Sequence, residues 1–597
     1  MKPPRFNQLQ PNTFFEEKMK KLCLTGPLTA LIVALAFSPA ISQAQVNVTT
    51  WHNDNWRTGQ NVEETSLTPT TVAPSAFGKI CSVQSVAKGG VLDGQVYAQP
   101  LTVWDSTNNR NVVYVVTEND SIFAFDGTNC KLITSNTNLI PRSTEAPADC
   151  HLIGGGACET ISPTVGILGT PVIDTVSNTI YLVTESQSPP AKPTTWYHRI
   201  HALDLSTLAE KTAYHSPHVL SGKSQGVSFV SHSHIQRPGL LWLSASQSGL
   251  ANNTVYIAFS MMDGVPGPHP RGWILGYNAQ NLQTPPLAYT TVPGSTLIGG
   301  GIWQAGAGLA AGVDQSGQTF IYFSSADGTF DLANSGPDAA DSFIKVTPSL
   351  QYPSGSYYFT PSDEFYRECS DLDYGSGGVV LIPDGSISGH PLVAVKGDKE
   401  SYLWALDRTN LGGYNAGQCS TNSCTACAPS NWANGNLQTL LASTSTAQAR
   451  STPAFWSGNN GNLYFAGGYD TLKKYPLYDS NNNCGPGPVL CSATAVTHNT
   501  KQSIVMGYSI TPSVSSGPAP QYQNGLVWGI KRGTYNSGLF AFDAGTMIEL
   551  YGADQCPTRD EVANPTKFSI PTVANGYVYV GTEADFDIFG PTNTACN

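Results

Sequence analysis

The sequence predicts an all-β fold, a single eight-bladed β-propeller with four-stranded blades, closed by an amino-terminal strand. Only 12% of the 597 residues are charged, whereas the chain contains 58 glycines, 41 prolines, 26 tyrosines and 22 phenylalanines. Few charges with many turn-forming and aromatic residues are typical of short strands joined by tight turns, and not of long surface helices. Two further observations, a repeated strand and its flanking segments, set the number of blades.

A short strand of aromatic and β-branched residues recurs eight times along the chain. Its central residues are Tyr114, Tyr181, Tyr256, Tyr322, Val393, Tyr464, Trp528 and Tyr579. Each copy follows a strand that contains Gly, Ser or Pro, and each precedes a further strand, which in most copies ends in a polar turn. Several repeats also show a fourth, outer strand, as at residues 209–216 of the second repeat. Four short strands repeated eight times are the pattern of propeller blades around an axis.

The two ends of the chain predict how the ring closes. The last repeat has no fourth strand, because the chain ends at Asn597 soon after its third strand. Residues 77–83 form a strand that belongs to no repeat, and pairing it with the last repeat would remove two open sheet edges. We therefore expect a propeller over residues 77–590, with an extension at 45–76 and a tail at 591–597. Two stacked β-sandwich domains are the alternative, but no linker divides the chain near its middle.

Residues 1–44 have the features of a secretory signal peptide. A basic stretch, Met19-Lys20-Lys21, precedes an apolar run at residues 24–37, and Ser42-Gln43-Ala44 has the pattern of a cleavage site. Met19 is a second candidate for the first residue. The sequence predicts a secreted or periplasmic protein without a membrane span after cleavage, because no other apolar run is of spanning length.

The charge and the cysteines narrow the partners and the compartment. The net charge is −12, and removal of the basic leader makes it more negative, which argues against nucleic acids and anionic membrane surfaces as partners. Of thirteen cysteines only Cys23 lies in the leader, and in an exported chain the others predict disulfides. Several lie in loops rich in Gly, Asn, Ser and Pro, so we expect local staples. Cys424 and Cys427 could instead form a redox or metal pair.

Several segments resemble one family of propellers. The turn after the third strand, seen at residues 124–129 and 541–546, is similar to the docking motif of pyrroloquinoline-quinone (PQQ) propellers. Residues 50–69 (TWHNDNWRTGQNVEETSLTP), 93–101 (DGQVYAQPL) and 371–378 (DLDYGSGG) resemble secreted bacterial PQQ-binding-like β-propeller repeat proteins. The resemblance implies the eight-bladed, quinoprotein-like fold of the quinoprotein alcohol dehydrogenases. Those enzymes carry two adjacent cysteines against the quinone, and no two cysteines are adjacent here.

Polar residues stand just before or within the strands that we expect to line the axis. They are Gln99, Gln236, Arg237, Trp303, Gln304 and Arg450, together with the acids Asp371 and Asp373. In a propeller these strand ends converge at the axial mouth, where ligands bind. We expect Arg237 and Arg450 to bind a carboxylate or a quinone oxygen, with Trp303 stacked on a ring. Alternatively, the two arginines pair with the two acids across a solvent-filled channel.

The pair Asp371 and Asp373 also predicts a metal site. On a strand, residues two apart face the same side, so both carboxylates would point together. Several hard oxygen ligands suit Ca²⁺. We therefore expect these two acids to be the metal ligands, if a metal is bound.

Three functions remain open from the sequence. The first is an exported propeller that binds a small-molecule or protein ligand at the axial mouth without chemistry of its own, because no complete catalytic set is visible. The second is a PQQ- and Ca²⁺-dependent oxidoreductase acting on an alcohol or sugar, which rests on the fold resemblance alone. The third is a scaffold in cell-envelope assembly. The identity of the ligand and the oligomeric state are not encoded in any motif.

Overall fold

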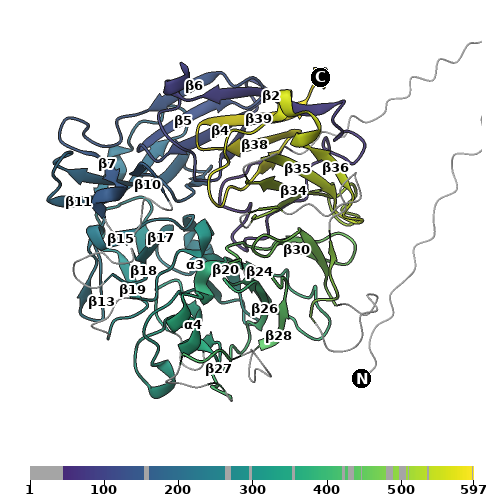
Figure 1. Ribbon diagram of the computed structural model, residues 1–597. Coiled ribbons are helices and arrows are strands. Elements are labelled where there is room, and N and C mark those ends of the chain that lie inside the picture. The colour runs from purple at the N-terminus through teal and green to yellow at the C-terminus, as the bar shows by residue number, and fades with distance from the viewer. Residues whose placement is uncertain are drawn as a thin grey trace, which may run out of the picture. The chain divides into compact units, whose positions relative to one another are not determined.

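The computed structural model shows eight sheets that follow one another around a ring in chain order (Figure 1). The structure describes residues 45–153, 161–261, 270–294, 299–352, 357–417, 419, 424–427, 436–445, 447–478, 489–495, 506–507, 510–533, 537–594 and 596. The leader predicted for residues 1–44 lies outside these ranges. The single eight-bladed propeller is confirmed, and the alternative of two stacked sandwiches is wrong.

Each blade contains four antiparallel strands. The innermost strands are β3 (Leu101–Asp105), β9 (Val172–Asp174), β16 (Leu241–Leu243), β20 (Ala310–Val313), β24 (Val379–Leu381), β29 (Ala454–Trp456), β33 (Ser513–Ser515) and β37 (Thr572–Ala574). The second strands are β4 (Arg110–Thr117), β10 (Thr179–Ser188), β17 (Thr254–Met261), β21 (Thr319–Ser324), β25 (Val393–Gly397), β30 (Asn462–Phe465), β34 (Leu526–Lys531) and β38 (Tyr577–Gly581).

The third and fourth strands complete the blades. The third strands are β5 (Ser121–Asp126), β11 (Thr195–Asp204), β18 (Trp273–Asn278), β22 (Phe343–Val346), β26 (Tyr402–Asp407), β31 (Lys473–Pro476), β35 (Gly538–Asp543) and β39 (Asp585–Pro591). The outermost strands are β6 (Leu132–Asn136), β12 (His218–Val219), β19 (Leu287–Thr290), β23 (Tyr358–Thr360), β28 (Asn436–Leu441), β32 (Thr494–Ala495), β36 (Glu549–Gly552) and β2 (Phe77–Gln84). The outer strand expected at 209–216 is thus misplaced: Glu210 makes a single bridge to Leu203, residues 212–214 form a 3-10 turn, and the strand itself begins at His218.

Several short strands and helices lie outside the four strands of each blade. They are the strands β7 (Ala146–Asp149), β8 (Thr164–Val165), β13 (Lys223–Ser224), β14 (Val227–Ser228), β15 (His234–Ile235) and β27 (Gly413–Tyr414), and the helices α1 (Cys150–Ile153), α3 (Ala245–Ser248), α4 (Glu364–Ser370) and α5 (Pro557–Asp560). Among the described residues no helix is long and apolar enough to cross a membrane.

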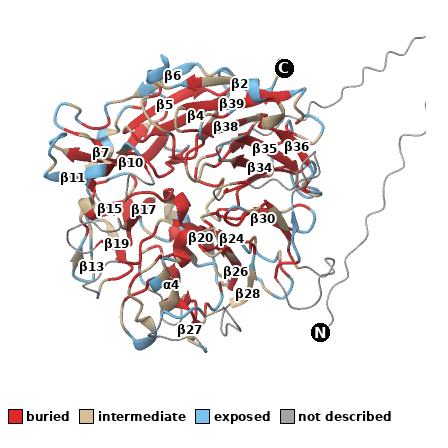
Figure 2. Cartoon of the chain, viewed as in Figure 1, coloured by how far each residue is buried: buried red, intermediate tan, exposed pale blue. Residues whose placement is uncertain are grey.

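The recurring tyrosine of the second strand joins each of several blades to the next. The hydroxyl of Tyr114 donates to the carbonyl of Leu205 in the following blade, at 3.1 Å. The same bond recurs in three further blades, as Tyr181 to Ala279, Tyr256 to Pro348 and Tyr464 to Ala544. These side chains are buried, and a buried hydroxyl needs a partner. The sequence repeat therefore reflects a repeated contact between blades, in strands that Figure 2 shows as mostly buried.

The amino-terminal strand closes the ring as predicted. β2 pairs antiparallel with β39, from Phe77 opposite Pro591 to Gln84 opposite Asp585, and supplies the outermost strand of the eighth blade. The disulfide Cys81–Cys130 then joins this strand to the turn after β5 in the first blade. The eighth blade is thus completed by backbone pairing of β2 with β39, and the disulfide joins it covalently to the first blade.

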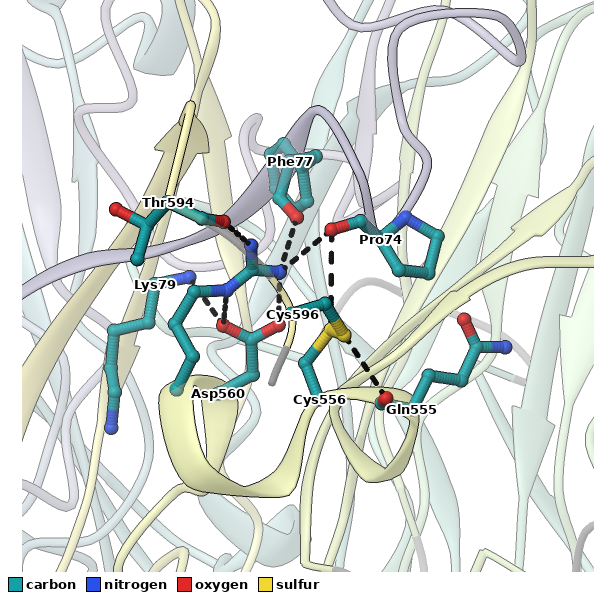
Figure 3. The surroundings of a disulfide bond; sticks show 9 residues. Pro74, Phe77, Lys79, Gln555, Cys556, Asp560, Thr594 and Cys596 are labelled. Atoms are coloured by element: carbon teal, nitrogen blue, oxygen red, sulfur yellow. Dashed lines mark hydrogen bonds and ion pairs between the residues drawn. A yellow bond between two sulfur atoms is a disulfide. The ribbon is translucent and has the colours of Figure 1, made fainter.

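A second disulfide, Cys556–Cys596, lies beside the start of β2 (Figure 3). Next to it in α5, Arg559 donates hydrogen bonds to backbone carbonyls near both ends of the chain, those of Pro74, Phe77 and Thr594. Two other disulfides are described. Cys369–Cys424 joins α4, between the fourth and fifth blades, to the loop before β28, and Cys419–Cys427 lies within that loop. Disulfides were predicted, and Cys419–Cys427, eight residues apart, is a short local staple of the kind expected; Cys158 and Cys484, predicted to pair with Cys150 and Cys491, lie outside the described residues.

Residues 46–61, which we call the belt, run once around the inside of the ring. The belt starts at the eighth blade, where Val46 bonds the side chain of Asn575, and returns to it at Asn61. On the way it makes a hydrogen bond with the innermost strand of every blade, through Thr102, Ile173, Trp242, Ala311, Leu381, Phe455, Val514 and Val573. Its last part, β1 (Gln60–Asn61), is a parallel strand beside β33. The belt therefore covers inner strand edges that would otherwise lack backbone partners.

Arg57 holds the belt in place. It is fully buried, and its Nε and Nη2 donate to the carbonyls of Leu309 (2.8 Å) and Leu240 (3.2 Å), just before the innermost strands of the fourth and third blades. Its Nη1 donates to the Thr50 hydroxyl (2.7 Å) and the Trp51 carbonyl (2.8 Å) within the belt. Burial lowers the pKa of Arg57 to about 9, so the guanidinium is still charged at neutral pH.

We expect Arg57→Ala to lower the free energy of unfolding by several kcal/mol, because each hydrogen bond from a charged donor contributes about 1.5–3 kcal/mol. Urea unfolding followed by tryptophan fluorescence measures the change. Arg110→Ala is the control, because Arg110 forms partly exposed ion pairs with Asp105 and Asp126, worth about 1 kcal/mol or less. Equal losses in the two variants would contradict the role given to the belt.

Arg559→Ala should raise amide hydrogen exchange in β2 and in the carboxyl-terminal residues, because three carbonyls lose their shared donor. Exchange in β4 should not change. Mass spectrometry of peptic fragments measures both regions. A second variant, Cys556→Ser with Cys596→Ser, keeps Arg559 and separates its effect from that of the disulfide. Unchanged exchange in β2 of the Arg559 variant would show that strand pairing alone closes the ring.

Candidate functional site

Several side chains that precede the innermost strands gather at one end of the ring. The belt bonds a residue within each innermost strand, whereas the predicted site residues stand before these strands. One of the buried belt side chains, Trp51, packs with Ala307 and Ile570 from two of these entry segments. We call the group that residues 97–99, 236–237, 303–307 and 567–570 form at one end of the ring the axial mouth. The belt thus forms the floor beneath it.

Arg237 lies among aromatic rings from three other blades. Its guanidinium carbon is 5.7 Å from the ring centres of both Tyr97 and Phe568, and the Phe568 and Trp303 rings are 6.0 Å apart. The guanidinium donates to two backbone carbonyls, those of Leu168 (3.1 Å) and Lys567 (3.2 Å). Tyr97, Arg237 and Trp303, far apart in the sequence, are therefore brought into one group. Phe568 was missed, although it precedes β37 as the predicted residues precede their strands.

The charge of Arg237 has no acidic partner among the described residues. Only 6% of the side chain is exposed, and burial lowers the pKa of Arg237 to about 10. No carboxylate of the described part of the chain lies within ion-pair distance of it. A buried cation without an anion is energetically unfavourable unless rings, carbonyls or a ligand compensate. The rings and two carbonyls supply part of this compensation.

The backbone around Arg237 is strained. Gln304, Ala305 and Phe568 have positive φ angles of 43°, 50° and 68°. Gly306 also has a positive φ, and a Cβ atom there would lie 2.5 Å from Arg237 Nη1. Side chains other than glycine rarely adopt this region, and such strain gathers at ligand-binding sites. Positive φ angles also occur at many other residues of the described chain, so this strain by itself does not single out the axial mouth.

The three predicted glutamines bond the protein itself. Gln99 Oε1 accepts from the backbone N–H of His52 in the belt at 2.8 Å. Gln236 Nε2 donates to the Pro238 carbonyl at 2.6 Å. Gln304 bonds backbone groups through both ends of its amide. These residues lie in or beside the mouth and fix its walls.

Asp371 and Asp373 lie in a separate charged group of the fourth and fifth blades. They follow α4 and do not lie on a strand, because Asp371 has a φ of 52° and ends the helix. The predicted strand geometry is wrong, yet the carboxylates still meet, because the Lys399 ammonium contacts both and lies 2.8 Å from Asp373. Oxygens of Asp327, Asp371 and Asp373 lie within 4.8 Å of one another.

The position of Lys399 bears on both interpretations of Asp371 and Asp373 made from the sequence, the ion pairs with two arginines and the Ca²⁺ site. The pairing of the acids with Arg237 and Arg450 is wrong, because their cation is Lys399. Half-buried Arg450 instead donates to the side chain of Gln448. The same ammonium occupies the position between the acids that a Ca²⁺ ion would need, so the acidic pair as it stands fits an ion-pair network better than a calcium site.

Asp341 adds a fourth carboxyl to this group. It is fully buried, its Oδ1 accepts from the backbone N–H of Tyr374 at 2.9 Å, and its Oδ2 has no hydrogen-bond partner. Burial and the charge of Asp373 raise the pKa of Asp341, and burial and Asp341 raise the pKa of Asp327. Protonation therefore stabilises the folded form of this group.

Asp341→Asn should stabilise the protein at pH 8 more than at pH 5. Because the folded pKa is raised, the folded state keeps a proton that the unfolded state releases above about pH 4, and stability falls as pH rises toward the folded pKa. Asn removes this charge and tolerates the φ of 41°. We expect a gain of about 1–3 kcal/mol at pH 8, measured by urea unfolding at both pH values. Asp384→Asn, at a partly exposed ion pair with Arg408, is the control. Equal gains at both pH values would contradict the assignment.

Comparison with known proteins identifies the fold. No family model matches the chain, and no curated protein matches it. Two solved structures align over 92% of this chain and 81% of their own. They are quinohemoprotein alcohol dehydrogenase ADHIIG from Pseudomonas putida HK5, with 12% identity and a TM-score of 0.54, and quinohemoprotein alcohol dehydrogenase from Comamonas testosteroni, with 13% identity and a TM-score of 0.53. At this identity the likeness concerns the fold and not the activity. The chain is an eight-bladed β-propeller whose fold is similar to that of the quinohemoprotein alcohol dehydrogenases.

Proposed function

We propose that this chain is an exported propeller that binds a small aromatic carboxylate at the axial mouth and performs no chemistry of its own. The observation that carries the proposal is Arg237, a buried cation without an acidic partner among the described residues, held among the rings of Tyr97, Phe568 and Trp303. A ligand carboxylate would supply the missing anion, and a flat ring would pack on the partly exposed Trp303 and Phe568.

Export is part of the proposal and is supported by the cysteines. The described chain contains four disulfides, and disulfides persist in oxidising compartments such as the periplasm or the cell exterior.

The oxidoreductase alternative is supported by the fold likeness. PQQ is itself a flat aromatic carboxylate, so the mouth residues would suit it, and the quinone would supply the redox chemistry. The accompanying Ca²⁺ does not fit Asp371 and Asp373 while Lys399 holds both. For this reason we rank simple binding first. The scaffold alternative has no specific contact in its favour.

Titration of the mature protein with PQQ and, separately, with 3-phenylpropionate tests the proposal, with isothermal calorimetry and tryptophan fluorescence as readouts. Both probes should bind. Arg237→Ala should weaken binding by about 10- to 100-fold, because a charge-assisted hydrogen bond is lost. The affinity of the Arg237→Lys variant should lie between the affinities of the unaltered protein and the Arg237→Ala variant.

Arg110→Ala is the matched control, because it removes an arginine at the far side of the first blade from the mouth and should leave affinity unchanged. Absence of binding, or equal affinity of the Arg237→Ala variant, would overturn the proposal. Dye-linked oxidation of an alcohol or sugar after reconstitution with PQQ and Ca²⁺ would place the oxidoreductase first.

A further inference from the structure

A buried glutamate beside Tyr97 has no partner for one of its oxygens. Glu118 follows β4 and is 2% exposed. Its Oε1 accepts a long hydrogen bond from the backbone N–H of Gln95 at 3.4 Å, while its Oε2 is buried without a hydrogen-bond partner. The side-chain oxygen of Gln95 is likewise buried and without a donor. Two unsatisfied acceptors in one place are unusual, because buried polar atoms are normally hydrogen-bonded.

The propeller repeat supplies an internal comparison for Glu118. A Thr-Glu pair recurs near the end of the second strand in the second and eighth blades, at Glu185 and Glu583. Glu185 lies 3.0 Å from the ring nitrogen of His198, and Glu583 lies 3.1 Å from the guanidinium of Arg532. At equivalent places two glutamates have a cationic or ionisable partner and Glu118 has none among the described residues. The missing partner is therefore a property of this blade and not of the repeat.

Glu118 lies next to the axial mouth. Its backbone N–H donates to the Gln95 carbonyl at 3.0 Å, two residues before Tyr97. Burial raises the pKa of Tyr97, the charges of Glu118 and Glu583 raise it further, and the charge of Arg237 lowers it, so Glu118 and Arg237 act on the same phenol. Burial raises the pKa of Glu118 itself to about 8, as expected for a carboxyl that lacks a cation.

We propose that Glu118 is a second polar anchor of the axial mouth and accepts hydrogen bonds from the ammonium group of a ligand whose carboxylate is bound by Arg237. The ligand is then an aromatic amino acid or a similar aromatic zwitterion. This inference rests on the proposed function and narrows it. A zwitterion supplies the anion that Arg237 lacks and the donors that Glu118 and Gln95 lack, and its ring packs on the exposed edges of Trp303 and Phe568. A ligand with a carboxylate and no ammonium would supply only the anion for Arg237.

Three probes with one ring and different charges test the inference in the mature protein. They are L-phenylalanine, 3-phenylpropionate, which lacks the ammonium, and 2-phenylethylamine, which lacks the carboxylate. By calorimetry, L-phenylalanine should bind at least about 10-fold more tightly than either of the other two, since each lacks one charge-assisted hydrogen bond. Glu118→Gln should weaken L-phenylalanine by about the same factor and leave 3-phenylpropionate unchanged.

Glu185→Gln is the control, because this residue occupies the equivalent place in the second blade and lies 3.0 Å from the ring nitrogen of His198, so affinities should not change. Circular dichroism and thermal unfolding check that each variant is folded. Equal affinity of L-phenylalanine and 3-phenylpropionate, with both dependent on Arg237, would overturn this inference and leave the proposed function standing. Absence of binding by all three probes would overturn this inference together with the proposed function, because the proposed function requires that 3-phenylpropionate binds. If the Glu118→Gln variant does not fold, the relative affinities of the three probes for the unaltered protein still show whether the ammonium group is bound.

Discussion

The hydrogen bonds of Arg57 to the carbonyls of Leu240 and Leu309 hold the belt against the wall of the channel, and the rest of the ring depends on that attachment. Every blade presents the edge of its innermost strand to the axis, and backbone groups that are buried there without a partner are unfavourable. The belt bonds all eight edges in succession. One buried guanidinium with several donors can fix such a segment where no regular sheet could form, because Arg presents its donors in a rigid fork.

The belt also has a consequence for function. Because it lies inside the ring, its Trp51 side chain packs beneath the entry segments of the axial mouth, and the N–H of His52 fixes Gln99 in the wall. The walls and the floor of the mouth are therefore built from parts of the chain that are remote in sequence. The positive φ angles of Gln304, Ala305 and Phe568 persist because these neighbours hold them, and they place the rings around Arg237.

Three buried charged groups of this propeller are balanced in different ways. Arg57 is satisfied by backbone carbonyls. Asp371 and Asp373 share the Lys399 ammonium, and burial raises the pKa values of the neighbouring Asp327 and Asp341. At the axial mouth, Arg237 and Glu118 are both buried, and neither has an oppositely charged partner in the described part of the chain. A structural role would leave both groups costing stability, whereas a ligand carrying both charges would satisfy them together. This difference is why the mouth, and not the acidic group, carries the functional proposal.

The sequence by itself determined the fold class, the number of blades and the closure of the ring. These follow from local chemistry, because a strand that is packed on both faces needs the same residues in every blade, and the tyrosine that bonds the next blade repeats with it. The sequence also selected Arg237 and Trp303 as mouth residues from their place before the innermost strands. It could not show that Lys399 belongs to Asp371 and Asp373, that Gln99 and Gln304 are used by the backbone, or that Glu118 lacks a partner. Only the tertiary structure decided these points, because the partner of a buried charge is set by which loops the ring brings together, and no spacing along the chain records that.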